Sequence, residues 1–147
     1  LVIDPFNRLR KSKDAPDNVD QYVAYVLDLI LNFCEMHGVH VWLVAHPKTL
    51  ESDRKTKKYP VPNAYDISGG ANFFNMADNI IVLHRSEDIA DATEVHVKKI
   101  RFKHVGKRTQ IPPLLEYDIG TGKYAVPEES NARYSVNERE IESVDPD

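Results

Sequence analysis

Apolar and polar positions in the first third of the chain predict a strand, a helix and a second strand. Residues 1–4 are a short apolar stretch that ends in Asp4. Seven apolar residues then follow at helical spacing, after Asp17 or Asn18 as the N-cap and before Gly38 as the C-terminal stop. They are Val19, Val23, Val26, Leu27, Ile30, Phe33 and Cys34. Residues 39–45 are nearly all apolar, which is typical of a strand covered on both faces. This order predicts a βαβ unit with parallel strands.

The rest of the pattern predicts a long loop and then shorter elements. Residues 46–65 are rich in Lys and Pro, and loops of this length in compact domains are usually functional or disordered. A short helix is expected over 71–77, and strands over 79–84 and 94–102. Residues 113–118 and 123–126 are expected to pair through the turn at 120–122. Residues 127–147 have no sustained apolar pattern and are predicted to form a flexible acidic tail.

Composition is that of an ordinary globular chain. Of 147 residues, 41% are hydrophobic and 29% charged, which suits one domain or a large part of one. The tail holds seven of the 23 acidic and two of the 19 basic residues, so residues 1–126 are slightly basic. No apolar run has the roughly 18 residues that a membrane span needs, so no membrane association is expected. The single Cys34 cannot form an internal disulfide, which indicates a reducing compartment.

Two polar residues, Asp4 and His46, end the two predicted parallel strands. P-loop ATPases use an Asp in this position to place a carboxylate beside magnesium, although an Asp before Pro5 is also an ordinary turn residue. A His at the adjacent strand end can donate a hydrogen bond to a terminal phosphate, or can simply start a loop. Ligands bind at this edge of open α/β sheets. A phosphate site formed by both residues and an ordinary turn or loop start therefore both remain possible interpretations.

Two basic clusters suit phosphate groups. Five basic residues lie within 48–58, in a loop that could follow a phosphodiester backbone or remain solvated. Six basic and no acidic residues lie within 98–108. On a strand, Lys99 and Arg101 would project from one face as a phosphate clamp or arginine finger. A nucleic-acid patch and a solvated edge strand are the alternatives.

Other kinds of chemistry have no support in the sequence. The six His residues lack metal-ligand spacing, and there is no G-x-S-x-G element. The phosphate-binding G-x-x-x-x-G-K-[ST] loop is also absent, so the chain alone is not expected to bind ATP productively.

The order of the motifs resembles the RecA-like helicase domain of the DnaB family, most closely its Twinkle and phage primase-helicase branch. The resemblance covers residues 1–125 and rests on four segments: LVIDP, VHVWLVAHP, YDISGGANFFNMADNIIVLHR, and VKKIRF together with EYDIGTGKY. It implies an α/β fold that is part of a RecA-like P-loop ATPase, with a largely parallel central sheet, flanking helices and a C-terminal β-hairpin. Residues 1–126 would be the C-terminal half of that motor domain. The Walker A loop and the water-activating carboxylate are then expected upstream of Leu1.

The resemblance also implies roles for the candidate residues. Asp4 would be the Walker B carboxylate that holds Mg²⁺ through water, and His46 the sensor of the ATP γ-phosphate. Arg101 would be the finger inserted into a neighbouring subunit's ATP site, with Lys99 as its companion. The implied DNA-binding residues are Lys48, Arg54, Lys55, Lys57, Lys58, Gly69 and Gly70. Ser68 stands where the family usually has Arg, which puts a side-chain phosphate contact there in doubt.

The predicted function is therefore part of an ATP-dependent replicative DNA helicase, for which a primase-helicase is one form. The parent is expected to be a hexameric ring that translocates on single-stranded DNA, cytoplasmic and bacterial or phage-encoded, while the chain alone is expected to be inactive. One alternative is a RecA-like ATPase of recombinase or regulatory type. Another is a DNA-binding or assembly module without enzymatic activity.

Overall fold

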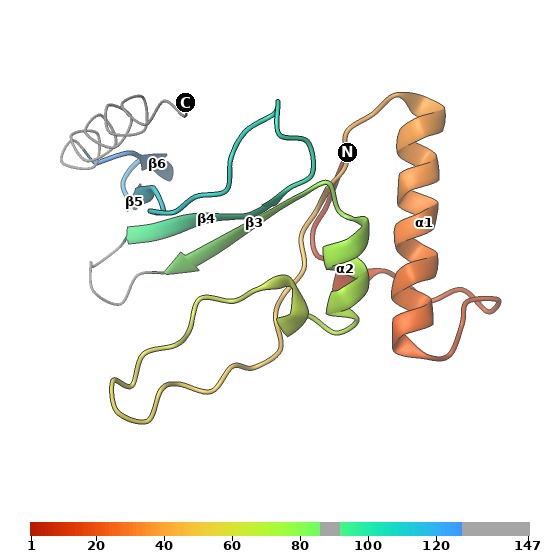
Figure 1. Ribbon diagram of the computed structural model, residues 1–147, viewed down its shortest axis with the longest axis horizontal. Helices are drawn as coiled ribbons and strands as arrows, with labels where there is room; N and C mark the ends of the chain where they lie inside the picture. The colour runs from red at the N-terminus through yellow and green to blue at the C-terminus, as the bar shows by residue number, and fades with distance from the viewer. Residues whose placement is uncertain (86–91, 128–147) are drawn as a thin grey trace, which may run out of the picture. The chain divides into compact units, whose positions relative to one another are not determined.

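A computed structural model describes residues 1–85 and 92–127 (Figure 1). Internal contacts divide the chain into two units, the first from Leu1 to Ile80 and the second beginning at Ile81. Among the described residues, none of the helices combines the length and apolar character that crossing a membrane requires.

The first unit contains the predicted βαβ arrangement. It consists of β1 (Val2–Ile3), α1 (Val19–His37) and β2 (Trp42–Leu43). The two strands pair in parallel, with Val2 opposite Trp42 and Ile3 opposite Leu43. The parallel pair confirms the predicted unit, although β2 is shorter than residues 39–45.

Both ends of α1 follow from local chemistry. The side-chain oxygen of Asn18 accepts the N–H groups of Asp20 at 2.9 Å and Gln21 at 3.2 Å, which satisfies donors that a helix start leaves open. Gly38 ends the helix in the left-handed conformation, with φ 59°. Its N–H donates to the Cys34 carbonyl. The sequence therefore located this helix correctly.

Aromatic and aliphatic side chains form the core of the first unit. Phe6, in the 3-10 turn η1 (Phe6–Arg8), meets Phe73 of α2 (Gly70–Met76) edge to face, with ring centroids 5.1 Å apart. Val23 and Leu27 of α1 are buried in the same cluster. By contrast, Val19 is 54% exposed, so the apolar positions at helical spacing in α1 include a residue outside its buried face.

The prediction that the second strand is covered on both faces is wrong for the described structure. Leu43 and Ala45 pack against the core, whereas Trp42 is 55% and Val44 37% exposed. Successive residues of a strand point to opposite faces, and the described part of the first unit covers one of them.

The second unit is a four-stranded sheet in the order β3-β4-β5-β6 (Figure 1). The strands are β3 (Asn79–Arg85), β4 (Ala92–Ile100), β5 (Leu114–Asp118) and β6 (Lys123–Ala125). β5 pairs antiparallel with both β4 and β6, and β3 and β4 run in opposite directions in Figure 1. The predicted largely parallel central sheet is therefore not found in the part of the chain that the structure describes. Six residues separate β3 from β4, too few for the dozen or more of a parallel crossover.

The predicted C-terminal hairpin is confirmed. The Asp118 carboxylate closes the β5–β6 turn by accepting the Thr121 hydroxyl at 2.7 Å and the Gly120 N–H at 2.8 Å. These bonds, led by that of Thr121, lower the pKa of Asp118. Gly122 then adopts φ 69°, which glycine reaches without steric cost. Beyond Pro127, the predicted tail lies outside the described residues.

Candidate functional site

Asp4 and His46 lie beyond the carboxyl ends of the paired strands β1 and β2. Val44 bonds the chain on both sides of Asp4: its N–H donates to the Ile3 carbonyl at 2.9 Å, and its carbonyl accepts the Phe6 N–H at 2.7 Å. Asp4 is therefore held beside Val44, and His46 follows Val44 by two residues. Both side chains are exposed to solvent. The parallel register thus places the two residues at one edge, where a phosphate-bearing ligand could reach both.

The basic loop that follows His46 is closed at its base. The Lys48 N–H donates to the Asp66 carbonyl at 2.7 Å. Asp66 belongs to the 3-10 turn η2 (Ala64–Asp66), whose start is a capping box. There, Asn63 Oδ1 accepts the Tyr65 N–H and Asp66 Oδ2 accepts the Asn63 N–H, both at 2.8 Å. The loop therefore begins and ends on a rigid support.

A second set of bonds, centred on Asp53, organises the tip of the loop. Asp53 Oδ1 accepts the N–H groups of Thr56 at 2.7 Å and Lys55 at 2.9 Å, and the Thr56 hydroxyl at 3.0 Å. These bonds, led by the Thr56 N–H, lower the pKa of the Asp53 carboxyl below its usual 3.8. The Asp53 N–H also donates to the Lys58 carbonyl at 2.8 Å. One carboxylate thus folds residues 53–58 into a tight turn.

The turn presents cations to solvent. Lys57 adopts a left-handed φ of 60°, an uncommon conformation for a residue with a side chain. Its N–H donates to the Asp53 carbonyl at 2.8 Å, which holds it in this position. The five basic residues of the loop are exposed. They are Lys48, Arg54, Lys55, Lys57 and Lys58. The loop is therefore an ordered basic projection, in contrast to a run of charges on an unstructured coil.

Gly69 and Gly70 have packing roles that the sequence did not predict. A Cβ on Gly69 would lie 2.7 Å from Val23 Cγ2. A Cβ on Gly70 would lie 2.2 Å from the Ala64 carbonyl oxygen. Gly70 is buried, and its N–H donates to the Ile67 carbonyl at 3.0 Å. Close packing of α2 against α1 and η2 explains both glycines, and the predicted contact of the Gly70 N–H with DNA finds no support in this arrangement.

Lys99 and Arg101 lie in the second unit. Lys99 is half-buried in β4, whereas Arg101 is exposed just after the strand ends at Ile100. The prediction of a strand to residue 102 is therefore wrong at its end. The alternation that would put both cations on one strand face does not extend to Arg101.

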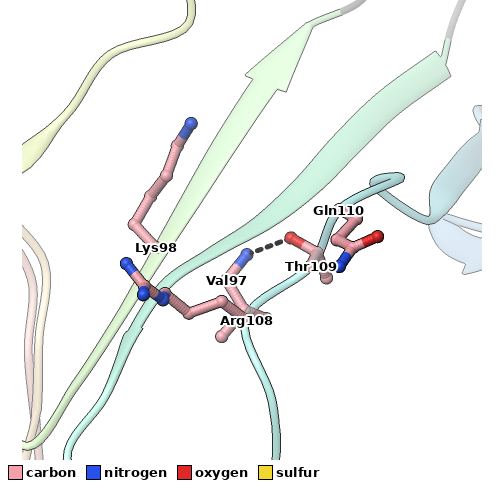
Figure 2. A pocket seen from close by; sticks show the side chains of 5 residues that line it. All are labelled: Val97, Lys98, Arg108, Thr109 and Gln110. Atoms are coloured by element: carbon pink, nitrogen blue, oxygen red, sulfur yellow. Dashed lines mark hydrogen bonds between the residues drawn. The ribbon is translucent and has the colours of Figure 1, made fainter.

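The loop after β4 forms a pocket of about 400 Å³ (Figure 2). Its lining residues are Val97, Lys98, Arg108, Thr109 and Gln110. Sequence reasoning identified the basic segment but not this pocket. It also missed Asp53 and Asn63, although D-x-x-T and N-x-x-D are recognisable turn and capping patterns. Among the described residues, no group of three or more His, Cys, Asp or Glu could hold a metal ion.

The first unit is thus an α/β unit in which Asp4 and His46 lie at one edge of the paired strands and a basic loop follows His46. The chain is 39% identical over 129 residues to the Twinkle homolog protein, chloroplastic/mitochondrial, of Arabidopsis thaliana. The match covers 85% of this chain but 17% of that protein, so the chain spans about a sixth of the relative's length. No protein-family model matches the chain. Because the relative's name refers to chloroplasts and mitochondria, the bacterial or phage origin stays a prediction.

Proposed function

We propose that this chain belongs to the Twinkle-like, DnaB-type helicases and forms part of the ATP-driven motor of a replicative DNA helicase. The observation that carries the proposal is the 39% identity to a Twinkle homolog over 85% of the chain. The four motif segments of the sequence point to the same family. The βαβ unit supports a RecA-like fold, because that fold places its ligands at the carboxyl ends of parallel strands.

Asp4 fits one part of a magnesium–ATP site. Mg²⁺ in such sites keeps several waters and binds through one or two carboxylates plus substrate phosphates. An exposed carboxylate at the end of β1 suits a contact through water, and a cage of protein ligands is not required. When bound, ATP would supply the phosphoryl group that is transferred to water, and Mg²⁺ would neutralise the charge that develops on it. Asp4 would hold the Mg²⁺ through water, and His46 would donate a hydrogen bond to the terminal phosphate.

The basic loop is the element that grips single-stranded DNA. It starts two residues after the phosphate-sensing His46, and its base is bonded to η2 through Lys48 and Asp66. A change in the contact of His46 with phosphate is therefore transmitted to the loop through a short, bonded path. Exposed Lys and Arg side chains on a folded turn bind the DNA backbone without regard to sequence.

Lys99 and Arg101 act on a neighbouring copy of the chain in this proposal. Arg101 is the arginine finger that stabilises negative charge on the transferred phosphate, and Lys99 is its companion cation. Since the finger serves the neighbour's ATP site, turnover requires a ring of subunits.

The DNA-binding part is tested by replacing Lys55 and Lys57 with Gln in this chain. Each single-strand phosphate contact contributes about 0.7 to the slope of log affinity against log salt, so two contacts predict a slope that is shallower by about 1.4. The matched control is Arg10→Gln with Lys13→Gln, which removes the same charge from exposed residues in the segment before α1. An unchanged slope, or an equal change in the control, would assign the loop to a solvated surface.

The enzymatic part is tested by strand displacement with the longer protein that contains this chain. The proposal expects ATP-dependent separation of a duplex that carries a single-stranded extension. ATP hydrolysis without strand separation would instead favour a recombinase-type or regulatory ATPase.

A further inference from the structure

The loop between β4 and β5 carries a structured pocket that the proposed helicase roles do not use (Figure 2). Two hydrogen bonds hold the loop against the strand. The Val97 N–H donates to Thr109 Oγ1 at 2.9 Å, and the Thr109 N–H donates to the Val97 carbonyl at 3.3 Å. Because these bonds join positions twelve residues apart, they fold the basic segment back onto β4.

This fold-back brings two cations to one pocket. Lys98 follows Val97 on the strand and Arg108 precedes Thr109 on the loop, so pairing of Val97 with Thr109 makes them neighbours across the turn. Figure 2 shows the head of Arg108 near the stem of Lys98, with the Lys98 amino group extending farther and Gln110 on the other side of Thr109. The pocket has a volume of about 400 Å³ and is largely open to solvent, so it could hold only a small group at the surface.

The charge of the pocket is not neutralised within the described chain. Residues 95–115 contain six basic and no acidic residues. The nearest carboxylate in sequence, that of Glu94, bonds to His96 at 2.8 Å. Within residues 1–85 and 92–127, neither Lys98 nor Arg108 forms an ion pair. Two cations that line one pocket and have no ion-pair partner in the described chain attract anions to it.

We propose that this pocket binds a phosphate group. The guanidinium of Arg108 and the ammonium of Lys98 supply charge-assisted donors, which are the strongest hydrogen bonds to phosphate. The Thr109 hydroxyl accepts from Val97, so its own hydrogen can be donated into the pocket. The Gln110 amide adds donors as well. A phosphate has enough acceptor oxygens to engage several of these groups, and its source is either a free nucleotide or the backbone of a nucleic acid.

The test is an NMR titration of the ¹⁵N-labelled 147-residue chain at constant ionic strength. Sodium pyrophosphate is the probe for free phosphate groups, and an oligothymidylate is the probe for a backbone. Binding is expected to shift the Val97 and Thr109 amides. Lys98→Gln with Arg108→Gln should weaken that binding by about tenfold or more. The control, Lys103→Gln with Lys107→Gln, removes the same charge from the same segment outside the pocket and should weaken it less than about threefold.

The outcomes distinguish binding in the pocket from attraction to the overall positive charge of the segment. A selective loss with pyrophosphate supports a nucleotide phosphate, and a selective loss with the oligothymidylate supports a backbone phosphate. Equal weakening in both double variants, or no shift of Val97 and Thr109 with either probe, would overturn the proposal. Thr109→Val keeps both cations but removes the hydroxyl that holds the loop, so it should also weaken binding. Binding at the parent's strength by this variant would refute the pocket geometry. None of these readouts depends on helicase activity.

Discussion

The packing of Gly70 against η2 predicts that Gly70→Ala changes stability in the direction opposite to the usual effect of alanine in a helix. In an unobstructed helix, Gly→Ala stabilises by about 0.5–1 kcal/mol because alanine loses less backbone entropy on folding. At Gly70 the added Cβ would lie 2.2 Å from the Ala64 carbonyl oxygen and 2.6 Å from Tyr65 Cα. Both are backbone atoms, so no side-chain rotation can relieve the contact. We therefore expect Gly70→Ala to destabilise the chain.

The size of this destabilisation follows from the cost of the steric contact and the opposing gain from alanine in a helix. Inserting a methyl group into a packed site costs about 1–3 kcal/mol, and a shift of the backbone places Gly70 at the upper end of that range. After the helical gain of alanine is subtracted, the net loss should be about 2 kcal/mol. Gly38→Ala is the matched control, because its Cβ would meet nothing within 4 Å. Its left-handed φ of 59° alone should cost about 1 kcal/mol.

Urea unfolding followed by circular dichroism measures both variants against the parent. The Gly70 variant should also bind single-stranded DNA more weakly, since a displaced η2 moves the Asp66 carbonyl that closes the base of the loop. If Gly70→Ala is as stable as the parent, or loses no more than Gly38→Ala, the close contact between α2 and η2 is refuted.

Three further predictions follow from single residues. Because the pKa of Asp53 is lowered, its hydrogen bonds stabilise the loop tip fully above about pH 3.8 and lose that effect as pH falls through the folded pKa. An NMR titration should show a carboxyl midpoint below 3.8. Asp53→Asn should abolish the shifts of the Lys55 and Thr56 amides that accompany this titration. Asn18→Ala should lower the free energy of unfolding by about 1 kcal/mol, because two N–H groups of α1 lose their acceptor. Arg101→Ala in the longer protein should abolish ATP hydrolysis but leave each subunit folded.

Each of these predictions has an outcome that would contradict it. An Asp53 midpoint at the ordinary value would show that the turn is not formed in solution. Unchanged stability of Asn18→Ala would show that another group caps α1. ATP turnover that survives Arg101→Ala, with Lys107→Ala as a control for lost charge, would refute the assignment of the finger.

Local rules in the sequence determined most elements and the two ends of α1. Asn18 and Gly38 bound α1, and Gly122 marks the β5–β6 turn, because capping and positive φ depend on the residue and its nearest neighbours. The βαβ order likewise predicted the parallel pairing of β1 with β2. The same order predicted that Asp4 and His46 lie at one edge of the strand pair.

Tertiary structure decided which surfaces are buried and which side chains meet. An unbroken apolar strand does not reveal whether a second layer covers it, and Trp42 is 55% exposed. The sequence suggested that the two glycines let DNA approach closely, but contacts with Val23, which is distant in sequence, and with Ala64 of η2 give them packing roles. In the same way, the pairing of Val97 with Thr109 brings Lys98 and Arg108 together. Contacts of this kind depend on how the chain folds back on itself, which periodicity and composition do not encode.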